Sequence, residues 1–458
     1  MMYLARASRW LPLAILLIAC KGRQPHHRIQ AVDDATGRGV PLVELTAFNS
    51  VPYYTDSNGL VAFHEPHLMG REIFFEVKSH GYESPHLPGS DLKGVKITPI
   101  AGGRTTVRLR RINIAERLYR LTGEGIYRDT GLLGEKSPLR QPLLNAQVMG
   151  TDGASTVVFK RRLFWFFGDT NGLNDINLSS AAATSILPGR GGLDPSAGVD
   201  LDFFVKPSGF VKPMIESKRD GLTWPYTPMV LPDEKGIERL VVRYDSGTGL
   251  GKTPAERGLA VFNEARSVFE PRVRWDVKAP VYPDGIAFPV SEGGVPYFYF
   301  ANGSPAPRTR VRAQWKDVLD LSRYERLPVA DPEIADVATG RKLKLRSTSV
   351  QWNGYRRRWV MLAQEVDGVA SKLGEIWFLE APAPAGPWNR ARQVLTHDRY
   401  AFYEVVHHPA LDQENGRYIY FSGTYSDFLS HPRNITPRYD YNLIMYRLDL
   451  ADTRLHLR

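Results

Sequence analysis

The sequence predicts an all-β protein. Short runs of alternating apolar and polar residues recur along the 458 residues, and long apolar runs with helical spacing are missing. Turn-forming residues separate these runs, among them many of the 40 Gly and 33 Pro. Aromatic residues make up 11% of the chain and gather in the expected strands, as β-sheet cores require. The length allows two or three domains with large cores.

The first 20 residues have the pattern of an export signal. Arg6 and Arg9 precede an apolar run from Leu11 to Ala19, and Cys20, the single cysteine of the chain, follows. This run is too short to cross a bilayer. A charged beginning, a short apolar stretch and a small residue before the cleavage point are typical of secreted proteins.

The segment Leu17-Ile18-Ala19-Cys20 resembles the lipobox of bacterial lipoproteins. The resemblance implies cleavage before Cys20, lipidation of its thiol and a membrane-anchored protein outside the cytoplasm. Lys21 stands where an aspartate would imply retention in the inner membrane, so we expect the outer membrane. The alternative is an ordinary secretory signal with a chance cysteine. Residues 21–27 form a polar tether.

Residues 28–110 are expected to form the first folded unit. Three motifs mark it, namely D-x-x-T-G-x-G-V-P from Asp33, T-D-S-N-G-x-V-x-F from Thr55 and S-H-G-Y-E from Ser79. Together they resemble the transthyretin-like or carboxypeptidase-regulatory β-sandwich, which implies a non-catalytic spacer or docking platform. The spacing of His64, His67 and His80 matches no common metal site.

Residues 111–143 connect this unit to the rest of the chain. We expect a short helix from Asn113 to Leu121, with Asn113 as its N-cap. The stretch from Gly123 to Asp129 is rich in glycine but lacks the spacing of a phosphate-binding loop.

From 144 to 450 one pattern recurs five times. Each unit has a first strand, a second strand rich in Trp, Tyr and Phe, and one or two more polar strands. The second strands are expected at 163–167, 239–242, 297–300, 358–362 and 418–421. Five such units predict a five-bladed β-propeller. A six-bladed or irregular arrangement is the alternative.

Four acidic residues are the best candidates for catalysis. First strands line the central channel of a propeller, so carboxylates on them, or just after second strands, are the ones to consider. Asp152, Asp284 and Glu404 belong to first strands, and Asp169 ends an aromatic second strand, where apolar neighbours tune protonation. Glycoside hydrolysis needs two carboxyl groups across the scissile bond, and a third often adjusts the acid. Each aspartate could instead stabilise a turn.

Substrate contacts are expected from aromatic residues and from one histidine. Trp224 and Tyr403 could stack on sugar rings, whereas core packing is the safer expectation for Trp165. Strand alternation places Glu404 and His408 on one face, so that His408 would lie near the channel. A channel cation such as calcium, held by His407 or His408, is the one cofactor considered; a packed histidine is the alternative.

The net charge of +10 favours an anionic partner. Nucleic acid is excluded for an exported lipoprotein, which leaves an acidic polysaccharide or the anionic membrane surface. For the basic clusters at Arg308–Arg312 and Arg356–Arg358, a solvated strand face and turn is the preferred explanation. With Cys20 lipidated, no thiol nucleophile remains. No G-x-S-x-G or H-E-x-x-H motif occurs. The sequence makes no prediction of oligomeric state.

Two short motifs carry a second resemblance. They are Gly150-Thr151-Asp152 and Phe167-Gly168-Asp169-Thr170. The second part of the chain resembles the five-bladed glycosidases of the arabinanase and xylosidase type, and especially a bacterial family linked to D-arabinan cleavage. The resemblance implies that Asp152 and Asp169 form the acidic pair, although Thr151 stands where that family has serine.

Two functions are therefore open. The first is a surface lipoprotein glycoside hydrolase, with Asp152 and Asp169 on one side of the sugar and Glu404 or Asp284 as their partner. The second is a non-catalytic lipoprotein that binds a glycan or a protein. A lyase needs a tyrosine or histidine base beside an arginine, and the many residues of these types neither establish nor exclude one.

Overall fold

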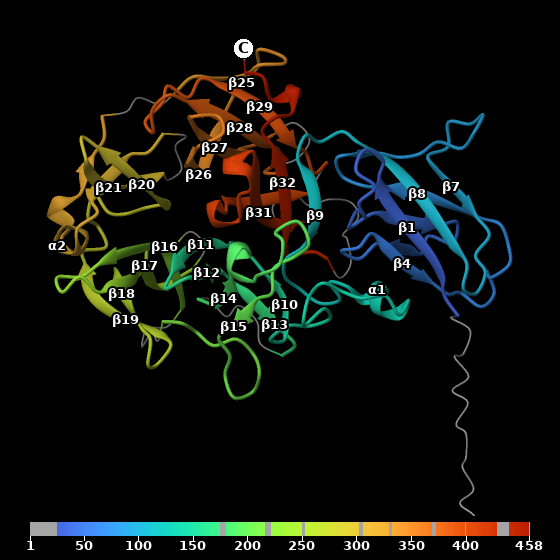
Figure 1. Ribbon diagram of the computed structural model, residues 1–458, viewed down its shortest axis with the longest axis horizontal. Helices are drawn as coiled ribbons and strands as arrows, with labels where there is room; N and C mark the ends of the chain where they lie inside the picture. Colours follow the sequence, from blue (N-terminus) through green and yellow to red (C-terminus); the bar gives the residue numbers. More distant parts are fainter. Residues whose placement is uncertain are drawn as a thin grey trace, which may run out of the picture.

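The computed structural model describes residues 25–174, 180–215, 221–249, 252–301, 306–328, 332–368, 372–398, 400–427 and 439–457. Within these ranges the protein is all-β, as predicted (Figure 1). The α-helices found there are two short ones, α1 (Arg128–Leu132) and α2 (Trp315–Leu319). No helix in the described part of the chain is long and apolar enough to cross a membrane. Cys20 and the predicted signal lie outside the described residues.

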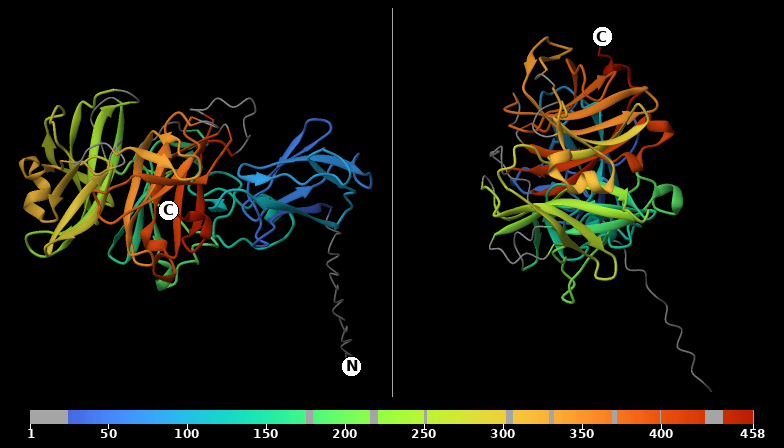
Figure 2. Two further views of the ribbon diagram at one scale, coloured as in Figure 1. Left: turned by 90° about the horizontal axis from the view of Figure 1, so that it is seen from above. Right: turned by 90° about the vertical axis from the view of Figure 1, so that its left-hand side faces the viewer.

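The first unit consists of two four-stranded sheets that share one core. The first sheet has the order β4-β1-β8-β6 and the second β3-β2-β5-β7. The strands are β1 (His27–Asp33), β2 (Glu44–Ala47), β3 (Pro52–Tyr54), β4 (Leu60–Phe63), β5 (Ile73–Lys78), β6 (Tyr82–Glu83), β7 (Gly94–Ile97) and β8 (Arg104–Arg111). Alternate residues of β5, namely Ile73, Phe75 and Val77, are buried in this core. Figure 2 shows this unit beside the remaining sheets, at one end of the molecule.

The remaining strands form five larger sheets and the small pair β10-β13. The first sheet contains β11 (Ser155–Phe159), β12 (Arg162–Phe166), β14 (Ala182–Ile186) and β15 (Asp202–Phe203), beside β10 (Val148–Thr151) and β13 (Thr170–Gly172). The second contains β16 (Leu222–Pro232), β17 (Glu238–Thr248), β18 (Glu256–Asn263) and β19 (Val268–Trp275). The third contains β20 (Ile286–Glu292), β21 (Val295–Ala301), β22 (Thr309–Arg312) and β23 (Glu325–Arg326).

The last two sheets complete the series. The fourth contains β24 (Ile334–Asp336), β25 (Lys342–Leu343), β26 (Leu345–Asn353), β27 (Arg358–Glu365), β28 (Ile376–Ala381) and β29 (Arg390–Leu395). The fifth contains β30 (Ala401–His407), β31 (Tyr418–Ser426), β32 (Asn442–Asp449) and β9 (Glu116–Arg120). A strand lies at each of the five positions where the sequence predicts a second strand. These strands are largely buried because both of their faces are covered: in β21, Tyr297 and Tyr299 belong to one core and Phe298 and Phe300 to another.

The five sheets follow one another around a closed ring. The strand β11 contacts β16, β16 contacts β20, β20 contacts β26, and β26 contacts β30. The Oγ1 of Thr156 on β11 lies 3.0 Å from Nδ1 of His408, directly after β30, which completes the cycle. Figure 1 shows the labelled first strands β11, β16, β20 and β26 facing one another around one region of the molecule.

The helix predicted from Asn113 to Leu121 is wrong. Strand β9 occupies this segment and pairs antiparallel with β32, so the connector supplies the outer strand of the last sheet. All five residues of β9 are buried, which a solvent-facing helix would not allow. Asn113 does not cap a helix, because its side chain bonds to both backbone groups of Thr396. Tertiary pairing has overridden a local capping signal.

The first unit packs against the last sheet through apolar and polar contacts. Leu42 and Tyr54 join the core of that sheet, and Nε2 of His80 lies 2.8 Å from the hydroxyl of Tyr425. The side chain of Arg117, on β9, is buried between the two parts. It donates hydrogen bonds to the carbonyl of Pro41 at 2.9 Å, and to the carbonyl of His80. The two parts therefore share buried surface.

Candidate functional site

Asp152 and Asp169 lie together at one end of the β10-β13 pair. Asp152 directly follows β10, Asp169 directly precedes β13, and the last register pair of the ladder is Thr151 with Thr170. The backbone N–H of Asp169 donates to Oδ1 of Asp152 at 2.7 Å, and the N–H of Asp152 donates to the carbonyl of Asp169 at 3.1 Å. The buried hydroxyls of Thr151 and Thr170 are 2.8 Å apart. Two reciprocal hydrogen bonds thus hold the sequence-predicted acidic pair, Asp152 and Asp169, next to each other.

Asp152 is held on its other side by two tyrosines. The hydroxyl of Tyr403 donates to Oδ2 of Asp152 at 3.3 Å, and Tyr441 also forms a side-chain hydrogen bond with this carboxyl. Burial raises the pKa of Asp152 to about 6; the negative charge of Asp169 adds to the rise, and the tyrosine hydrogen bonds oppose it. Tyr403, which was predicted to stack on a sugar ring, therefore also orients the carboxyl group of Asp152 through its hydroxyl.

Asp169 has a single aromatic donor. The Nε1–H of Trp224 donates to Oδ1 of Asp169 at 2.7 Å. Burial raises the pKa of Asp169, and the hydrogen bond from Trp224 works against this rise because it favours the ionised form. Trp224 is half-buried, so part of its ring still reaches solvent. The two residues come from successive sheets, which places Asp169 at the boundary between them.

Glu404 reaches the same place from the fifth sheet. Its backbone has φ 51°, a left-handed value, and the pairing of β30 with β31 shifts register between Tyr403 and Val406. Such a bulge redirects a side chain. A side chain added at Gly153 would strike Oε2 of Glu404, so this carboxyl lies against the turn that carries Asp152.

The surroundings of Glu404 favour its neutral form. Burial is the largest cause that raises its pKa to about 8; the charges of Asp152 and Asp169 add to the rise, and Arg346 opposes it. Solvent nevertheless reaches the side chain, which is exposed. Many protein atoms surround this carboxyl and raise its pKa, but they leave part of the side chain open to solvent. At neutral pH the site therefore holds a protonated Glu404 beside Asp152, whose pKa of about 6 is lower.

His408 does not join this group. It is fully buried against Trp165, with ring centroids 4.9 Å apart. Its Nδ1 lies 3.0 Å from Oγ1 of Thr156 and its Nε2 2.8 Å from Oγ of Ser422, so both nitrogens have partners. The predicted alternation is wrong because the bulge at Glu404 breaks it. Burial lowers the pKa of His408 to about 3, and the residue is a neutral part of the core.

The structure gives no ligand set for the channel cation considered above. Nε2 of His407 lies 2.9 Å from Oδ1 of Asp412, so this histidine is also engaged. In the described ranges, no group of three or more histidine, cysteine, aspartate or glutamate side chains could hold a metal ion. Trp165 is fully buried and donates to Oγ of Ser185, as expected for core packing.

Asp284 belongs to a neighbouring ionic cluster. Its Oδ1 lies 3.6 Å from a guanidinium nitrogen of Arg243, which also binds Asp245 at 3.1 Å. Arg257 binds Asp245 at 2.7 Å and lies over the ring of Tyr282. Asp284 is not among the main charges that shift the pKa values of the three grouped carboxyls. The structure thus brings together three of the four predicted acids.

The predicted basic clusters have ion-pair partners. Arg310 lies at the surface of the third sheet and pairs with Glu292 and Glu325. Arg356 pairs with Glu380 at 2.7 Å. Arg310 lies on a strand and Arg356 in the turn between β26 and β27, and both side chains are partly exposed, in keeping with the alternative expectation.

Sequence reasoning missed Tyr441, Gly153 and Arg346. Tyr441 precedes the final strand, and no local pattern connects it with a turn almost 300 positions earlier. Gly153 follows Asp152 and has a φ of +56°. Glycine is the residue that favours this left-handed backbone, so its presence after Asp152 was the local signal in the sequence. Arg346 stands near the beginning of a predicted first strand, where only acidic residues were considered.

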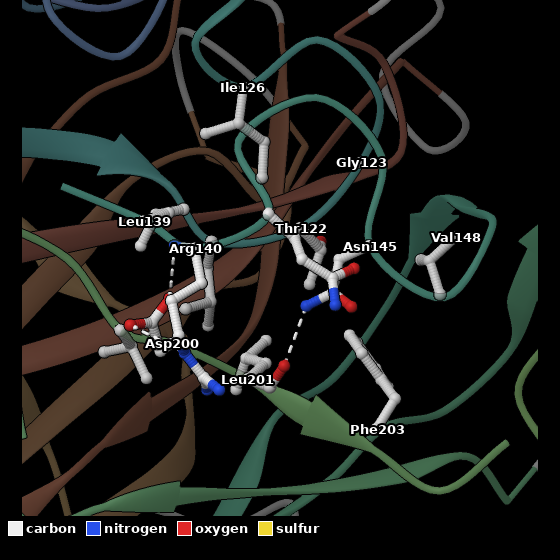
Figure 3. A pocket seen from close by; sticks show the side chains of 13 residues that line it. Thr122, Gly123, Ile126, Leu139, Arg140, Asn145, Val148, Asp200, Leu201 and Phe203 are labelled. Atoms are coloured by element: carbon white, nitrogen blue, oxygen red, sulfur yellow. Dashed lines mark hydrogen bonds and ion pairs between the residues drawn. The ribbon is translucent and has the colours of Figure 1, made fainter. Parts of the chain in front are cut away.

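A separate hollow lies at the other end of β10. Val148, Asn145, Leu201 and Arg140 line it, next to the connector (Figure 3). Its polar groups are used within the fold, since Asn145 donates to the carbonyl of Leu201 at 2.8 Å and Asp200 accepts from the backbone of Arg140. None of the three grouped carboxyls lines this hollow.

No protein-family model matches the chain, and no curated protein matches it. Solved structures with similarity include an exo-β-1,3-galactanase from Phanerochaete chrysosporium, at 12% identity and a TM-score of 0.41 over 76% of this chain and 67% of that one. An exo-1,5-α-L-arabinanase from a bovine ruminal metagenomic library has 11% identity and a TM-score of 0.38, over 66% of this chain and 94% of that one. A thermostable family-43 glycoside hydrolase has 13% identity and a TM-score of 0.35, over 66% and 90%. Because these TM-scores are low, we base the function on the residues of this chain.

Proposed function

We propose that this protein is a glycoside hydrolase whose site consists of Asp152, Asp169 and Glu404. The observation that carries this proposal is the meeting of three carboxyls from distant parts of the chain, whose surroundings raise all three pKa values, that of Glu404 to about 8 and that of Asp152 to about 6. Such pairs of carboxyls with different protonation states are what glycosidic bond cleavage needs.

Glu404 is the general acid. Its pKa of about 8 keeps the carboxyl protonated at neutral pH, and its exposure gives substrate access to the proton. In the reaction Glu404 gives this proton to the glycosidic oxygen, and the bond between that oxygen and the anomeric carbon breaks.

Asp169 is the second carboxylate of the reaction. It takes a proton from water, whose oxygen then bonds to the anomeric carbon, or it attacks that carbon itself; the separation from the acid decides between the two. Trp224 holds the reactive carboxylate in place through its indole N–H. Asp152, fixed by Tyr403 and Tyr441, places negative charge beside Glu404 and raises the pKa of that acid.

We also propose the wider organisation. The five sheets are the five blades of a β-propeller over residues 144–450, and residues 28–110 form an N-terminal β-sandwich joined by a connector over 111–143. The cyclic contacts of the first strands support the propeller, and the shared core of two sheets supports the sandwich. Lipidation of Cys20 and outer-membrane anchoring stay predictions from the sequence; an unmodified Cys20 in the mature protein would contradict them.

The test compares the wild-type chain with Asp169→Asn on arabinans, xylans, galactans and acidic or sulfated glycans. We expect the wild type to release reducing sugar and Asp169→Asn to lose at least about a hundredfold in rate, as removal of a reacting carboxylate does. Asp91→Asn, at an exposed position of the first unit, makes the same chemical change far from the site and should keep full activity. Retained glycan binding with no hydrolysis in either protein would favour the non-catalytic binding function instead.

A further inference from the structure

We propose that Arg346 forms an anion-binding subsite beside Glu404, so that the substrate carries a negatively charged group next to the bond that is cleaved. The inference rests on the proposed function for its account of the reaction. Its binding component can be tested without hydrolysis.

Two neighbouring strands place Arg346 level with Glu404. The backbone N–H of His407 on β30 donates to Oγ of Ser349 on β26 at 3.2 Å. Arg346 precedes Ser349 by three residues, and Glu404 precedes His407 by three residues. Gln364, the pairing partner of Arg346 on β27, donates to the carbonyl of Phe402 at 3.0 Å. The beginnings of β26 and β30 therefore lie side by side.

Both strands are irregular at this level. The register of β26 against β27 shifts between Ser347 and Ser349, and that of β30 shifts between Tyr403 and Val406. Bulges gather next to functional sites because they re-aim side chains. Here two adjacent strands do so at the same height, one beside a basic residue and the other at an acidic residue.

Arg346 has no carboxylate partner among the residues that the structure describes, and its side chain is exposed. Three other largely buried or partly buried arginines are instead committed to ion pairs: Arg243 on β17 and Arg257 on β18 bind Asp245, and Arg341, just before β25, binds Glu365. Glu404 does not neutralise Arg346 either, because a protonated carboxyl carries no charge. A guanidinium without a carboxylate partner is a fork that matches the paired oxygens of a carboxylate or a sulfate ester.

The charge balance explains why an anionic substrate would need this residue. Asp152 and Asp169 repel an anionic group that enters the site. Arg346 is the cation that acts on Glu404, as its opposing effect on the pKa of this acid shows. Removal of Arg346 should therefore weaken charged ligands much more than neutral ligands of the same shape.

The experiment measures binding by calorimetry in the full chain. The probes are glucuronate-decorated xylo-oligosaccharides, the same oligosaccharides after carboxyl reduction, and O-sulfated xylo-oligosaccharides. We expect the wild type to bind at least one charged probe about tenfold more tightly than the reduced one, the scale of one charge-assisted contact. Arg346→Gln should bind charged and reduced probes about equally, and Arg346→Lys should keep part of the preference because it keeps the charge.

Arg312→Gln is the matched control, since it removes the same charge from an exposed position on β22. This variant should keep the wild-type preference. A wild type without preference, a preference that survives in Arg346→Gln, or no binding of any charged probe would each overturn the proposal. A preference for the glucuronate probe or for the sulfated probe identifies which anion the subsite accepts. If hydrolysis alone fails, that result counts against the proposed function, and the binding data still decide whether Arg346 forms an anion-binding subsite.

Discussion

At the scale of single residues, protonation is the central property of the site. Glu404 faces two other carboxyls and is surrounded by protein, so its folded environment favours the neutral form. The groups that act on it or respond to it are Asp152, Asp169, Arg346, Tyr226, Tyr403 and Tyr441. The proposed acid role of Glu404 therefore depends on surroundings in which ionisation of this carboxyl lowers the stability of the fold.

Glu404→Gln should separate activity from stability. The pKa of Glu404 is raised from 4.5 to about 8, so the folded protein holds this proton more tightly than the unfolded chain does. The resulting stability is fully present below the unfolded value and is lost as pH rises through the folded value. Glutamine cannot ionise and avoids this loss. We therefore expect the variant to melt about 1–3 °C above the wild type near pH 9, and level with it near pH 4, while hydrolysis falls at least about a hundredfold.

The measurement is a series of thermal melts across this pH range beside a hydrolysis assay. Glu414→Gln, an exposed change outside the site, provides the control and should show no such pH-dependent difference. A variant that melts below the wild type at high pH would show that Glu404 contributes more by its contacts than it costs by its charge.

The sequence could nominate the acids but could not assign their roles. The two short motifs identify Asp152 and Asp169 because the acids occupy turns that follow strands. The role of Glu404 depends on charges from the first and fourth sheets, and no local pattern contains these. His408 was nominated for the site but belongs to the core. The bulge at Glu404 breaks the strand alternation, so the side chain of His408 does not share the face of Glu404.

At the scale of elements, the turn after β10 and the bulge in β30 fit together. Gly153 adopts φ +56° and leaves room for the Glu404 carboxyl directly above it. Two local irregularities on different sheets thus define one contact. A side chain at position 153 would disturb both the turn and the acid.

Gly153→Ala should lower kcat/KM by about tenfold to a hundredfold, because a methyl group there displaces the acid from its working position. Gly134→Ala is a matched control: Gly134 has φ +71°, and a side chain there meets no neighbour. Both variants should lose a similar stability of about 1 kcal/mol, from the left-handed backbone alone. Kinetic assays and thermal melts check this, and equal activity in both variants would contradict the contact with Glu404.

Element prediction succeeded where burial dominates and failed where pairing is remote. The second strands were predictable because strands buried on both faces must be apolar, as in Phe298 to Ala301. Strand β9 was not, because its charged residues find partners far along the chain. Glu116, for example, pairs with Arg447. From the local sequence alone, the same charged residues fit the polar face of a helix equally well.

At the scale of the whole molecule, the first unit is joined to the ring by buried polar contacts. The sequence resemblance implied a spacer or docking platform. The structure adds that Leu42 and Tyr54 belong to the core of the last sheet, and that Arg117 links three chain segments there. Such contacts between distant segments have no signature in a single sequence.

Arg117→Ala should destabilise the molecule strongly. The guanidinium donates to the carbonyl of Pro41 and the hydroxyls of Ser79 and Tyr446, among others, and its removal leaves buried acceptors without a donor. We expect the free energy of unfolding to fall by about 3–5 kcal/mol. Arg108→Ala, which breaks an exposed pair with Asp34, should cost less than about 1 kcal/mol. Denaturant titrations measure both, and similar losses in the two variants would contradict the role given to Arg117.

The position of β9 has a consequence for how the protein is made. This strand leaves the ribosome long before its partner β32, which lies far along the chain. Until then the ring stays open, and Asp152 lacks Tyr441, which precedes β32, as well as Tyr403 and Glu404. A nascent chain that has completed its first four sheets therefore carries both motif aspartates but no assembled site. Under the proposed function, activity should therefore appear only after β32 has been synthesised, and the site stays unassembled while the preceding sheets are produced.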